Sequence, residues 1–191
     1  MGSRRAITAA LLALLLALPA GAGAEEAAPA APTVEADVKD GIYRVRGHFE
    51  VPVSKEVARE VLTDYEALPG FTPSVRKSLV RLRRPDFVYV EQEAVETALF
   101  VSRTLRVLLV VREEGDRITF RDISQRDFLL YDGAWTLEAV PGGCRVTYAL
   151  AANPKGPAPG FIAAPVFKGS GERMLGQLRA EMVRRAAAKN P

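Results

Sequence analysis

Residues that usually carry catalysis or bind metals are scarce in this chain. It has one cysteine, Cys144, and one histidine, His48, among 191 residues. A single cysteine excludes an intramolecular disulfide and any metal site built from several thiolates. A Ser/His/Asp triad would need His48 in the interior, yet the alternation of its segment places it outward beside Arg46 and Glu50. The sequence also contains no HExxH, Walker, dinucleotide-binding or CxxC motif, so we predict no metal site and no cofactor.

Neither sign of charge dominates the chain. It has 26 Lys and Arg against 23 Asp and Glu, a formal net charge of +3. Arg4 and Arg5 precede an apolar run from Ala6 to Leu18, which Pro19 ends and Ala22-Gly23-Ala24 follows. A basic start, an apolar stretch and small residues are typical of a signal peptide. We therefore predict a signal peptide over residues 1–24 and a periplasmic or secreted protein.

Removal of this segment would leave a nearly neutral chain, because 24 basic residues would then face 23 acidic ones. Bulk charge thus gives no support to nucleic-acid binding. The apolar run is shorter than the ~20 residues of a spanning helix. Ser3-Arg4-Arg5 leaves twin-arginine export open, and an uncleaved anchor is the other alternative. Residues 25–39 begin with Ala, Pro and Glu, and we predict a disordered leader there.

Alternating apolar and polar residues predict an antiparallel sheet of seven strands in one domain over residues 40–191. Gly115 and the Gly142-Gly143 pair favour tight turns between successive strands. Consecutive hairpins imply an antiparallel sheet with one covered face. The expected strands are Ile42–Val51, Val75–Arg83, Phe87–Thr97, Phe100–Glu113, Arg117–Ser124, Ala134–Val140 and Cys144–Ala152.

Two helical segments are expected. The first runs from Ser54, a suitable N-cap, to Tyr65, and Pro69-Gly70 and Pro73 then end it in a short aromatic bridge. The second is long, from Gly160 to Ala188, with a glycine-containing stretch at 168–171 that would permit a kink. Its apolar residues fall close to one face, which can be buried only against the concave side of the sheet. These residues are Phe167, Leu175, Leu178 and Met182.

The order strand, helices, meander and long helix resembles the helix-grip fold of the SRPBCC (START-like) superfamily. The stretch from Val61 to Val75 is similar to the segment after the first helix in its polyketide-cyclase and coenzyme-Q-binding-like branch. The resemblance covers about residues 40–187. It implies an α+β domain whose sheet wraps around the C-terminal helix and encloses a hydrophobic cavity. One such scaffold serves carriers, enzymes and interaction modules alike.

Strand parity and the bridge supply the candidate cavity residues. Tyrosine and tryptophan suit a ligand with an apolar body and a polar group. Small residues of the C-terminal helix, such as Gly171 and Gly176, would give either ligand space or close packing. The candidates for ligand binding are Tyr65, Phe71, Arg103, Trp135, Tyr148, Phe167 and Leu175.

Two arginines on one apolar strand need a partner. Arg103 and Arg106 lie on opposite faces by alternation, so one of them would point inward and require an anionic group. Glu91, Glu93 and Asp122 are the nearest candidates on adjacent strands, and a cross-strand ion pair on the outer face is the simpler interpretation.

We therefore expect an exported protein that binds a small hydrophobic or amphipathic ligand without a catalytic residue set. The resemblance implies a lipid, an isoprenoid quinone or a polyketide-like compound. One alternative is a cyclase or dehydratase, which would need Arg103 inward with Glu93 or Tyr148. The other is an envelope protein-interaction module, which an apolar outer sheet face would favour. Transient membrane contact and the oligomeric state stay open.

Overall fold

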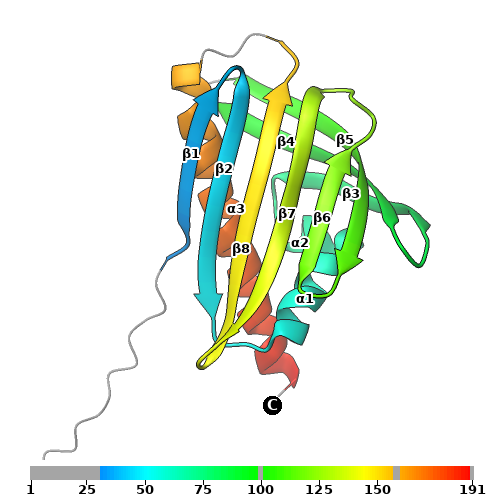
Figure 1. Ribbon diagram of the computed structural model, residues 1–191, viewed down its shortest axis with the longest axis vertical. Coiled ribbons are helices and arrows are strands. Elements are labelled where there is room, and N and C mark those ends of the chain that lie inside the picture. The colour runs from blue at the N-terminus through cyan, green and yellow to red at the C-terminus, as the bar shows by residue number, and fades with distance from the viewer. Residues whose placement is uncertain (1–30, 99–100, 157–159, 190–191) are drawn as a thin grey trace, which may run out of the picture.

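The computed structural model describes residues 31–98, 101–156 and 160–189, which form an α+β domain (Figure 1). Eight strands make one antiparallel sheet in the order β1-β2-β8-β7-β6-β5-β4-β3. Three α-helices and a 3-10 helix complete the described fold. The elements are β1 (Thr33–Lys39), β2 (Ile42–Val51), α1 (Lys55–Thr63), η1 (Tyr65–Ala67), α2 (Leu68–Phe71), β3 (Val75–Arg83), β4 (Val88–Ala98), β5 (Val101–Glu114), β6 (Arg117–Asp122), β7 (Phe128–Val140), β8 (Gly143–Pro154) and α3 (Gly160–Lys189).

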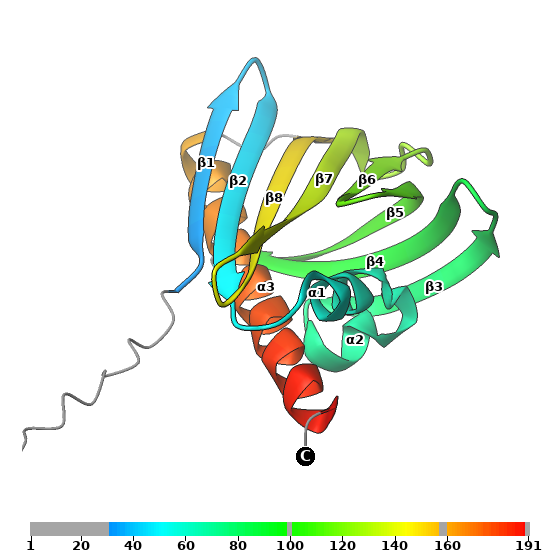
Figure 2. The same cartoon turned by 60° about the horizontal axis from the view of Figure 1, so that its bottom comes forward.

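The sheet curves around α3, which lies on its concave side (Figure 2). The helix packs mainly on β1 and β2, and α1 contacts it near its C-terminal end. Its predicted apolar face is confirmed, since Leu175, Leu178 and Met182 are almost completely buried. Helix α3 runs through residues 168–171 without interruption, so the glycines there do not divide it. No helix among the described residues is long and apolar enough to span a membrane.

The sheet has eight strands, and the prediction of seven was wrong. The additional strand is β1, which lies in the segment predicted as a disordered leader over residues 25–39. It pairs along its whole length with β2, from Thr33 opposite His48 to Lys39 opposite Ile42. Val34 is its one fully buried side chain, because β1 is an edge strand. The folded domain therefore begins before residue 40, whereas the signal peptide predicted over residues 1–24 lies outside the described residues.

The strand β2 shows how closely burial follows the sequence pattern. Tyr43, Val45, Phe49 and Val51 are buried, while His48 is exposed as its parity predicts. Strand β2 then pairs with β8, which joins the N-terminal hairpin to the end of the meander. Cys144 lies on β8 and is a buried free thiol whose pKa burial raises, in agreement with a structural role.

The helical segment between β2 and β3 closes one end of the concave side. The Ser54 side chain caps α1 by accepting a hydrogen bond from the Val57 amide at 3.4 Å. After α1 the chain makes η1, and Pro69 then lies in the first turn of α2, where its missing N–H costs nothing. This stretch, residues 65–71, is the predicted aromatic bridge and lies between α3 and β3 (Figure 2).

Candidate functional site

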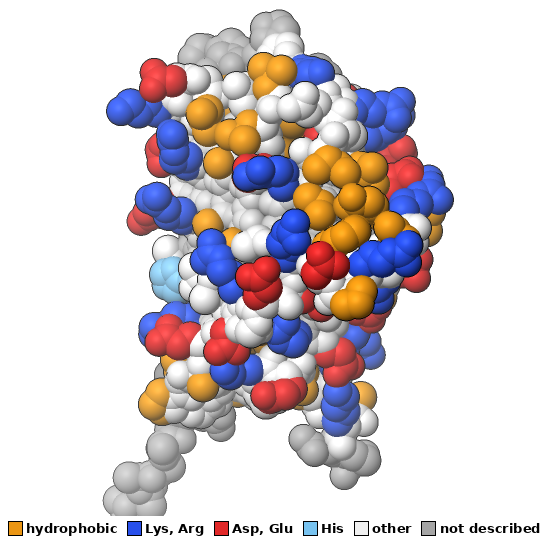
Figure 3. All heavy atoms as spheres, turned by 45° about the vertical axis from the view of Figure 1, so that its right-hand side comes forward, with side chains coloured by type: hydrophobic (Ala, Val, Ile, Leu, Met, Phe, Trp, Pro, Cys, Tyr) orange, Lys and Arg blue, Asp and Glu red, His pale blue; other side chains and the backbone are white. Residues whose placement is uncertain are grey.

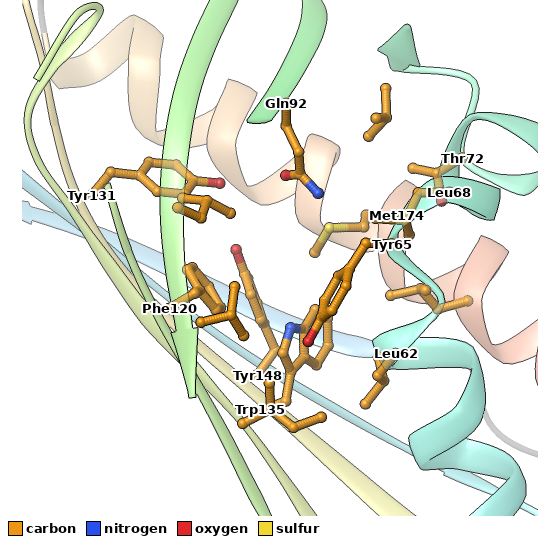
Figure 4. A pocket seen from close by; sticks show the side chains of 15 residues that line it. Leu62, Tyr65, Leu68, Thr72, Gln92, Phe120, Tyr131, Trp135, Tyr148 and Met174 are labelled. Carbon is orange, nitrogen blue, oxygen red and sulfur yellow. The ribbon is translucent and has the colours of Figure 1, made fainter. Parts of the chain in front are cut away.

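A cavity of about 100 Å³ lies between the sheet, the middle of α3 and the helical segment 62–72. None of the residues that line it carries a formal charge, and most are apolar. The lining residues are Leu62, Tyr65, Leu68, Thr72, Val75, Gln92, Leu109, Val111, Ile118, Phe120, Tyr131, Trp135, Tyr148, Met174 and Leu178. Figure 4 shows their side chains directed at a shared space.

Three neighbouring strands supply the aromatic wall. Trp135 on β7 lies directly opposite Tyr148 on β8, and their ring centroids are 4.4 Å apart. Phe120 on β6 stacks on Tyr148 with centroids 6.3 Å apart and contacts Tyr131 at 6.0 Å. Opposite residues of an antiparallel pair share a face, so this register places all four rings on the concave side.

Gly133 explains how Phe120 can lie between the two tyrosines. It is opposite Phe120 in the register, and a Cβ atom at this position would come within 2.2 Å of the Phe120 Cζ atom. A side chain there would therefore push the phenylalanine ring into the cavity. The absence of a side chain at 133 is what leaves room for the ring.

Two tyrosine hydroxyls point into the cavity, those of Tyr131 and Tyr148 (Figure 4). Burial raises the pKa of Tyr131 to about 12, although the adjacent Tyr148 hydroxyl partly offsets this effect. Burial also raises the pKa of Tyr148 well above its usual value. Both phenols are therefore neutral hydrogen-bond donors at physiological pH.

The opposite wall carries two further polar groups. The Gln92 amide points into the cavity (Figure 4), and its Nε2 atom donates to the Ser78 hydroxyl at 3.2 Å. Thr72 is only 2% exposed, and its Oγ1 atom has no hydrogen-bond partner among the described residues. An unpaired buried hydroxyl costs stability unless something in the cavity satisfies it.

Tyr65 lies where the helical segment meets the sheet. Its hydroxyl donates a hydrogen bond to Glu113 Oε1 at 2.8 Å, and Arg83 Nη1 lies 3.5 Å from the same oxygen. Burial, followed by this hydrogen bond, raises the pKa of Tyr65. The bond anchors the start of η1 to the end of β5 and leaves the Tyr65 ring as part of the cavity wall.

Three of the seven predicted site residues are brought together at the cavity, namely Tyr65, Trp135 and Tyr148. The other predicted apolar residues lie outside its lining. Phe167 stacks on Tyr43 with centroids 4.9 Å apart, and Leu175 is fully buried between α3 and β2. Phe71 lies beneath the Arg185 guanidinium, 5.6 Å from ring centroid to Cζ.

The two arginines of β5 separate as alternation requires. Arg106 forms an ion pair with Glu93 at 3.0 Å, which confirms the cross-strand pair. Arg103 is on the opposite face, across from Glu96, but it is exposed and donates to the Lys155 carbonyl at 3.0 Å. Arg103 and Glu93 therefore do not converge, so this one of the two residue pairs suggested for a cyclase is not assembled.

Several lining residues escaped prediction for identifiable reasons. Tyr131 precedes the predicted start of β7 at Ala134, because Asp132-Gly133 looks like a turn, whereas the strand actually starts at Phe128. Gln92 shares the parity of the buried Val88 and Val90, and that parity could have revealed an inward polar group. Met174 lies beside Leu175 on α3, and helical periodicity does not separate the residue that faces the cavity from the one that packs on β2.

The outer face of the sheet is mixed in character. Glu91 pairs with both Lys77 and Arg81 on β3. Hydrophobic side chains gather beside charged ones on the face shown in Figure 3. Among the described residues, Leu129 on β7 and Ile123, which follows β6, are 58% and 45% exposed. This surface is neither the polar face expected of a simple carrier nor a uniformly apolar interface.

Solved structures with this fold include proteins from several bacteria. A protein of Thermus thermophilus is 20% identical with a TM-score of 0.66, and the match covers 74% of this chain and 98% of the other. A STAR-related lipid transfer protein (fragment 25–204) of Xanthomonas axonopodis is 20% identical with a TM-score of 0.58, covering 80% and 99%. The ZhuI aromatase/cyclase of Streptomyces sp. R1128 is 13% identical with a TM-score of 0.62, covering 76% and 96%.

No curated protein matches the chain closely enough to count as a relative. The structural matches establish the START-like fold that the sequence order predicted. A family match is independent of them, because the sequence model described as "Polyketide cyclase / dehydrase and lipid transport" matches residues 51–179. That range includes all fifteen residues of the cavity lining. The chain therefore belongs to the polyketide cyclase/dehydrase and lipid transport family.

Proposed function

We propose that this protein is exported and binds a small hydrophobic or amphipathic molecule in the cavity. The observation that carries the proposal is the uncharged, largely apolar space walled by four aromatic side chains of the sheet and closed by α3 and residues 62–72. Membership of the family supports the same role. A lipid, an isoprenoid quinone and a polyketide-like compound are the ligand classes under consideration.

The size of the cavity limits what can be held at one time. Ligand pockets usually measure roughly 300–1,000 Å³, whereas this cavity measures about 100 Å³. In this conformation it is smaller than the roughly 150 Å³ apolar cavity that is known to hold benzene, so it has room only for a short segment of a larger molecule. Burial of an aromatic ring removes roughly 150–250 Å² from water, worth about 4–6 kcal/mol before the costs of association. A one-ring compound should therefore bind weakly, and both it and a larger ligand require the walls to move.

Export is part of the proposal because of the sequence of residues 1–24. Two arginines, an apolar run and small residues follow one another there as in a signal peptide. A carrier outside the cytoplasm would shield an apolar compound from water. Pulse-labelling of the full chain and N-terminal sequencing of the mature form test this part. A new N-terminus at Glu25 is expected, and an intact Met1 would refute cleavage.

A cyclase-type enzyme is the second candidate, and one observation favours it. The neutral phenols of Tyr131 and Tyr148 project into the cavity and could polarise a carbonyl group. A compound extracted from the protein and then returned to it distinguishes the two roles. Recovery of the unchanged compound favours the carrier, and conversion favours the enzyme.

Native mass spectrometry of the protein from its own host's envelope, followed by organic extraction, is the main test. A stoichiometric apolar adduct is expected. The Met174→Trp variant, which fills the cavity from α3, should lose it. Val183→Trp is the matched control, because Val183 lies on the same helix and is 40% exposed. The proposal would be contradicted if the native protein showed only the mass of the chain without an adduct, both as purified and after incubation with envelope lipids.

A further inference from the structure

We propose that Arg59 and Arg83 bind the anionic head of an amphipathic ligand, at the end of the cavity where α1 meets the sheet. The head is a carboxylate or a phosphate, and the apolar part of the same molecule lies in the cavity. The inference rests on the proposed function and deepens it by naming the ligand class as an amphipathic acid.

The Arg59 guanidinium is not satisfied by its neighbours. Its Nη2 atom is buried and has no hydrogen-bond partner among the residues that the structure describes. Lys55, one turn earlier on α1, is by contrast paired with Asp116 at 2.8 Å. A guanidinium stays charged at every physiological pH, and a buried N–H without an acceptor lowers stability. An anionic oxygen beside Arg59 would remove that penalty.

Arg83 is a second cation at the same place. Its guanidinium lies over the Tyr65 ring, 5.8 Å from Cζ to the ring centroid, and is 3.5 Å from Glu113 Oε1. Burial and then the hydrogen bond to Glu113 raise the pKa of Tyr65, whereas the charges of Arg83 and Arg59 act in the opposite direction. Both guanidinium groups therefore lie near the Tyr65 hydroxyl.

The charges of this cluster do not cancel. Two arginines, Arg59 and Arg83, face one carboxylate, that of Glu113. This carboxylate already accepts the Tyr65 hydroxyl at 2.8 Å and is in contact with Arg83, so its negative charge is offset. The charge of Arg59 remains, and an anion is the group that would complete the cluster.

The cluster continues the wall of the cavity. Arg59 lies three residues before Leu62 on α1, and Glu113 lies two residues after Val111 on β5, so each shares a face with a lining residue. Tyr65 belongs to both regions and lies beside Leu62 on the helical side of the cavity (Figure 4). The wall thus changes from uncharged to cationic along its length, which suits a molecule with an apolar part and an acidic head.

The opposite side of the cavity, between β4 and α3, offers no comparable site among the described residues. There the Glu96 carboxylate accepts the Ser170 hydroxyl at 2.6 Å, and Arg173 is 3.9 Å from the same oxygen. Arg103 donates to the Lys155 carbonyl. These cations have acceptors within the chain, so the head group is expected at Arg59 instead.

The small cavity makes the head important for affinity. With about 100 Å³ it takes up only a short apolar segment, and the contacts of that segment alone bind weakly. Hydrogen bonds between a guanidinium and an anion add a factor of roughly 10 to 100. The acid should therefore bind much more tightly than a neutral molecule of the same shape.

Hexanoate and hexanamide test this at pH 7, because they have nearly the same shape and differ in charge. The indole N–H resonance of Trp135, the chain's single tryptophan, reports on the cavity in an NMR titration. The Nε–H resonance of Arg59 reports on the head. Hexanoate should bind at least 10-fold more tightly than hexanamide and shift both resonances. Acetate and inorganic phosphate, which supply only a head, should bind at least 10-fold more weakly than hexanoate.

Variants assign the effect to the two arginines. Arg59→Gln and Arg83→Gln should each weaken hexanoate binding about 10-fold and leave hexanamide binding unchanged, which shows that the cavity is intact. Arg59→Lys should retain part of the preference for the acid, because it keeps the charge but loses the planar fork. Arg112→Gln is the matched control, since Arg112 is exposed and alternation places it on the other face of β5 from buried Val111. It should change neither affinity.

The outcomes separate the inference from the proposed function. Equal binding of hexanoate and hexanamide, each with a shift of Trp135, would overturn the inference and leave a protein for neutral apolar ligands. Acetate or phosphate binding as tightly as hexanoate would also overturn it, in favour of a site for free anions. A preference for hexanoate that persists in Arg59→Gln would place the head elsewhere. If no probe shifts Trp135 and extraction yields no adduct, both the inference and the proposed function fail.

Discussion

Helix α3 packs closely against one half of the concave side of the sheet and leaves a cavity against the other half. Over β1 and β2 the contacts are as close as side chains allow, because Leu175 of α3 lies where a Cβ atom on Gly47 would be only 2.6 Å from its Cδ1 atom. Gly171 similarly lies against Val34, with 3.1 Å from its would-be Cβ atom to Val34 Cγ1. Over the other half, Met174 and Leu178 of α3 face the cavity.

The difference shows that glycine has two uses here. At Gly47 and Gly171 a missing side chain lets helix and sheet approach, so these residues tighten the fold rather than create ligand space. At Gly133 it makes room for the Phe120 ring and thereby shapes the cavity wall. One half of the domain thus supplies stability, and the other half can remain incompletely filled.

The largest expected effect comes from shortening the buried side chain. Leu175→Ala should lower the free energy of unfolding by about 3–5 kcal/mol, since it leaves a void in a close-packed region. Met174→Ala, one residue away on the cavity side, should cost clearly less because its neighbours already leave space. Urea unfolding measures both. Equal losses would show that the two halves are packed alike.

The C-terminal end of α3 gives a pH-dependent effect. Hydrogen bonds from Arg184, and then from Arg185, lower the pKa of the Glu181 carboxyl to about 2, against an ordinary value of 4.5. The stabilisation is therefore fully present above pH 4.5 and lost as the pH falls towards 2. It should amount to about 1–2 kcal/mol, since Arg184 is largely exposed.

Urea unfolding of the native protein and Glu181→Gln from pH 7 to pH 2 tests this. The stability difference between them should shrink as the pH falls through that window. A difference that does not change with pH would mean that the Glu181 charge is not the source. Arg185 also bonds Asp64 at 2.8 Å, so the effect reports on the attachment of the helical segment to α3.

A smaller effect of the opposite sign is expected on the cavity side. Thr72→Val should raise the free energy of unfolding by about 1 kcal/mol, because it removes a buried hydroxyl without a partner among the described residues. Thr147→Val on the exposed face of β8 is the control and should change little. A loss of stability in Thr72→Val would contradict the absence of a partner for this hydroxyl.

The smallest change sharpens the comparison within α3 itself. A Cβ atom at Gly176 would meet nothing within 4 Å, unlike one at Gly171. Gly176→Ala should therefore stabilise the protein by about 0.5–1 kcal/mol through the lower entropy of the unfolded chain. Gly171→Ala should destabilise it. Thermal unfolding of both variants checks the signs, and a common sign would contradict the close contact at 171.

Most of the fold was predictable because turns and alternation agree along the meander. Strands β2 and β3 have the predicted bounds, and the Ser54 cap was identified correctly. Strand β1 was missed although Val34, Ala36 and Val38 alternate with polar residues, because the segment 25–39 was interpreted from the Ala, Pro and Glu residues at its start. The start of β7 was missed because Asp132-Gly133 is also a turn sequence.

The candidate site was less predictable than the fold. Strand parity placed Trp135 and Tyr148 correctly because the register of β7 and β8 is regular there. The 3.6-residue periodicity of α3 did not distinguish the residues that line the cavity from those that pack on the sheet. Phe167 and Leu175 share the apolar face with Leu178, yet only Leu178 reaches the cavity. An inward side chain can pack against another element or line the cavity. Which of the two occurs depends on residues distant in the sequence, such as Gly47 and Gly133.

The pairing of β2 with β8 has a consequence for how the chain folds. Phe49 lies opposite Val146, so two neighbouring strands of the sheet are nearly a hundred residues apart in the sequence. The loop closed by this pairing includes the whole meander, and non-local pairing of this kind slows folding. During synthesis the hairpin of β1 and β2 must wait with its apolar face uncovered until β8 and α3 have been made. Its open edge is then available for wrong pairing until β8 has been made.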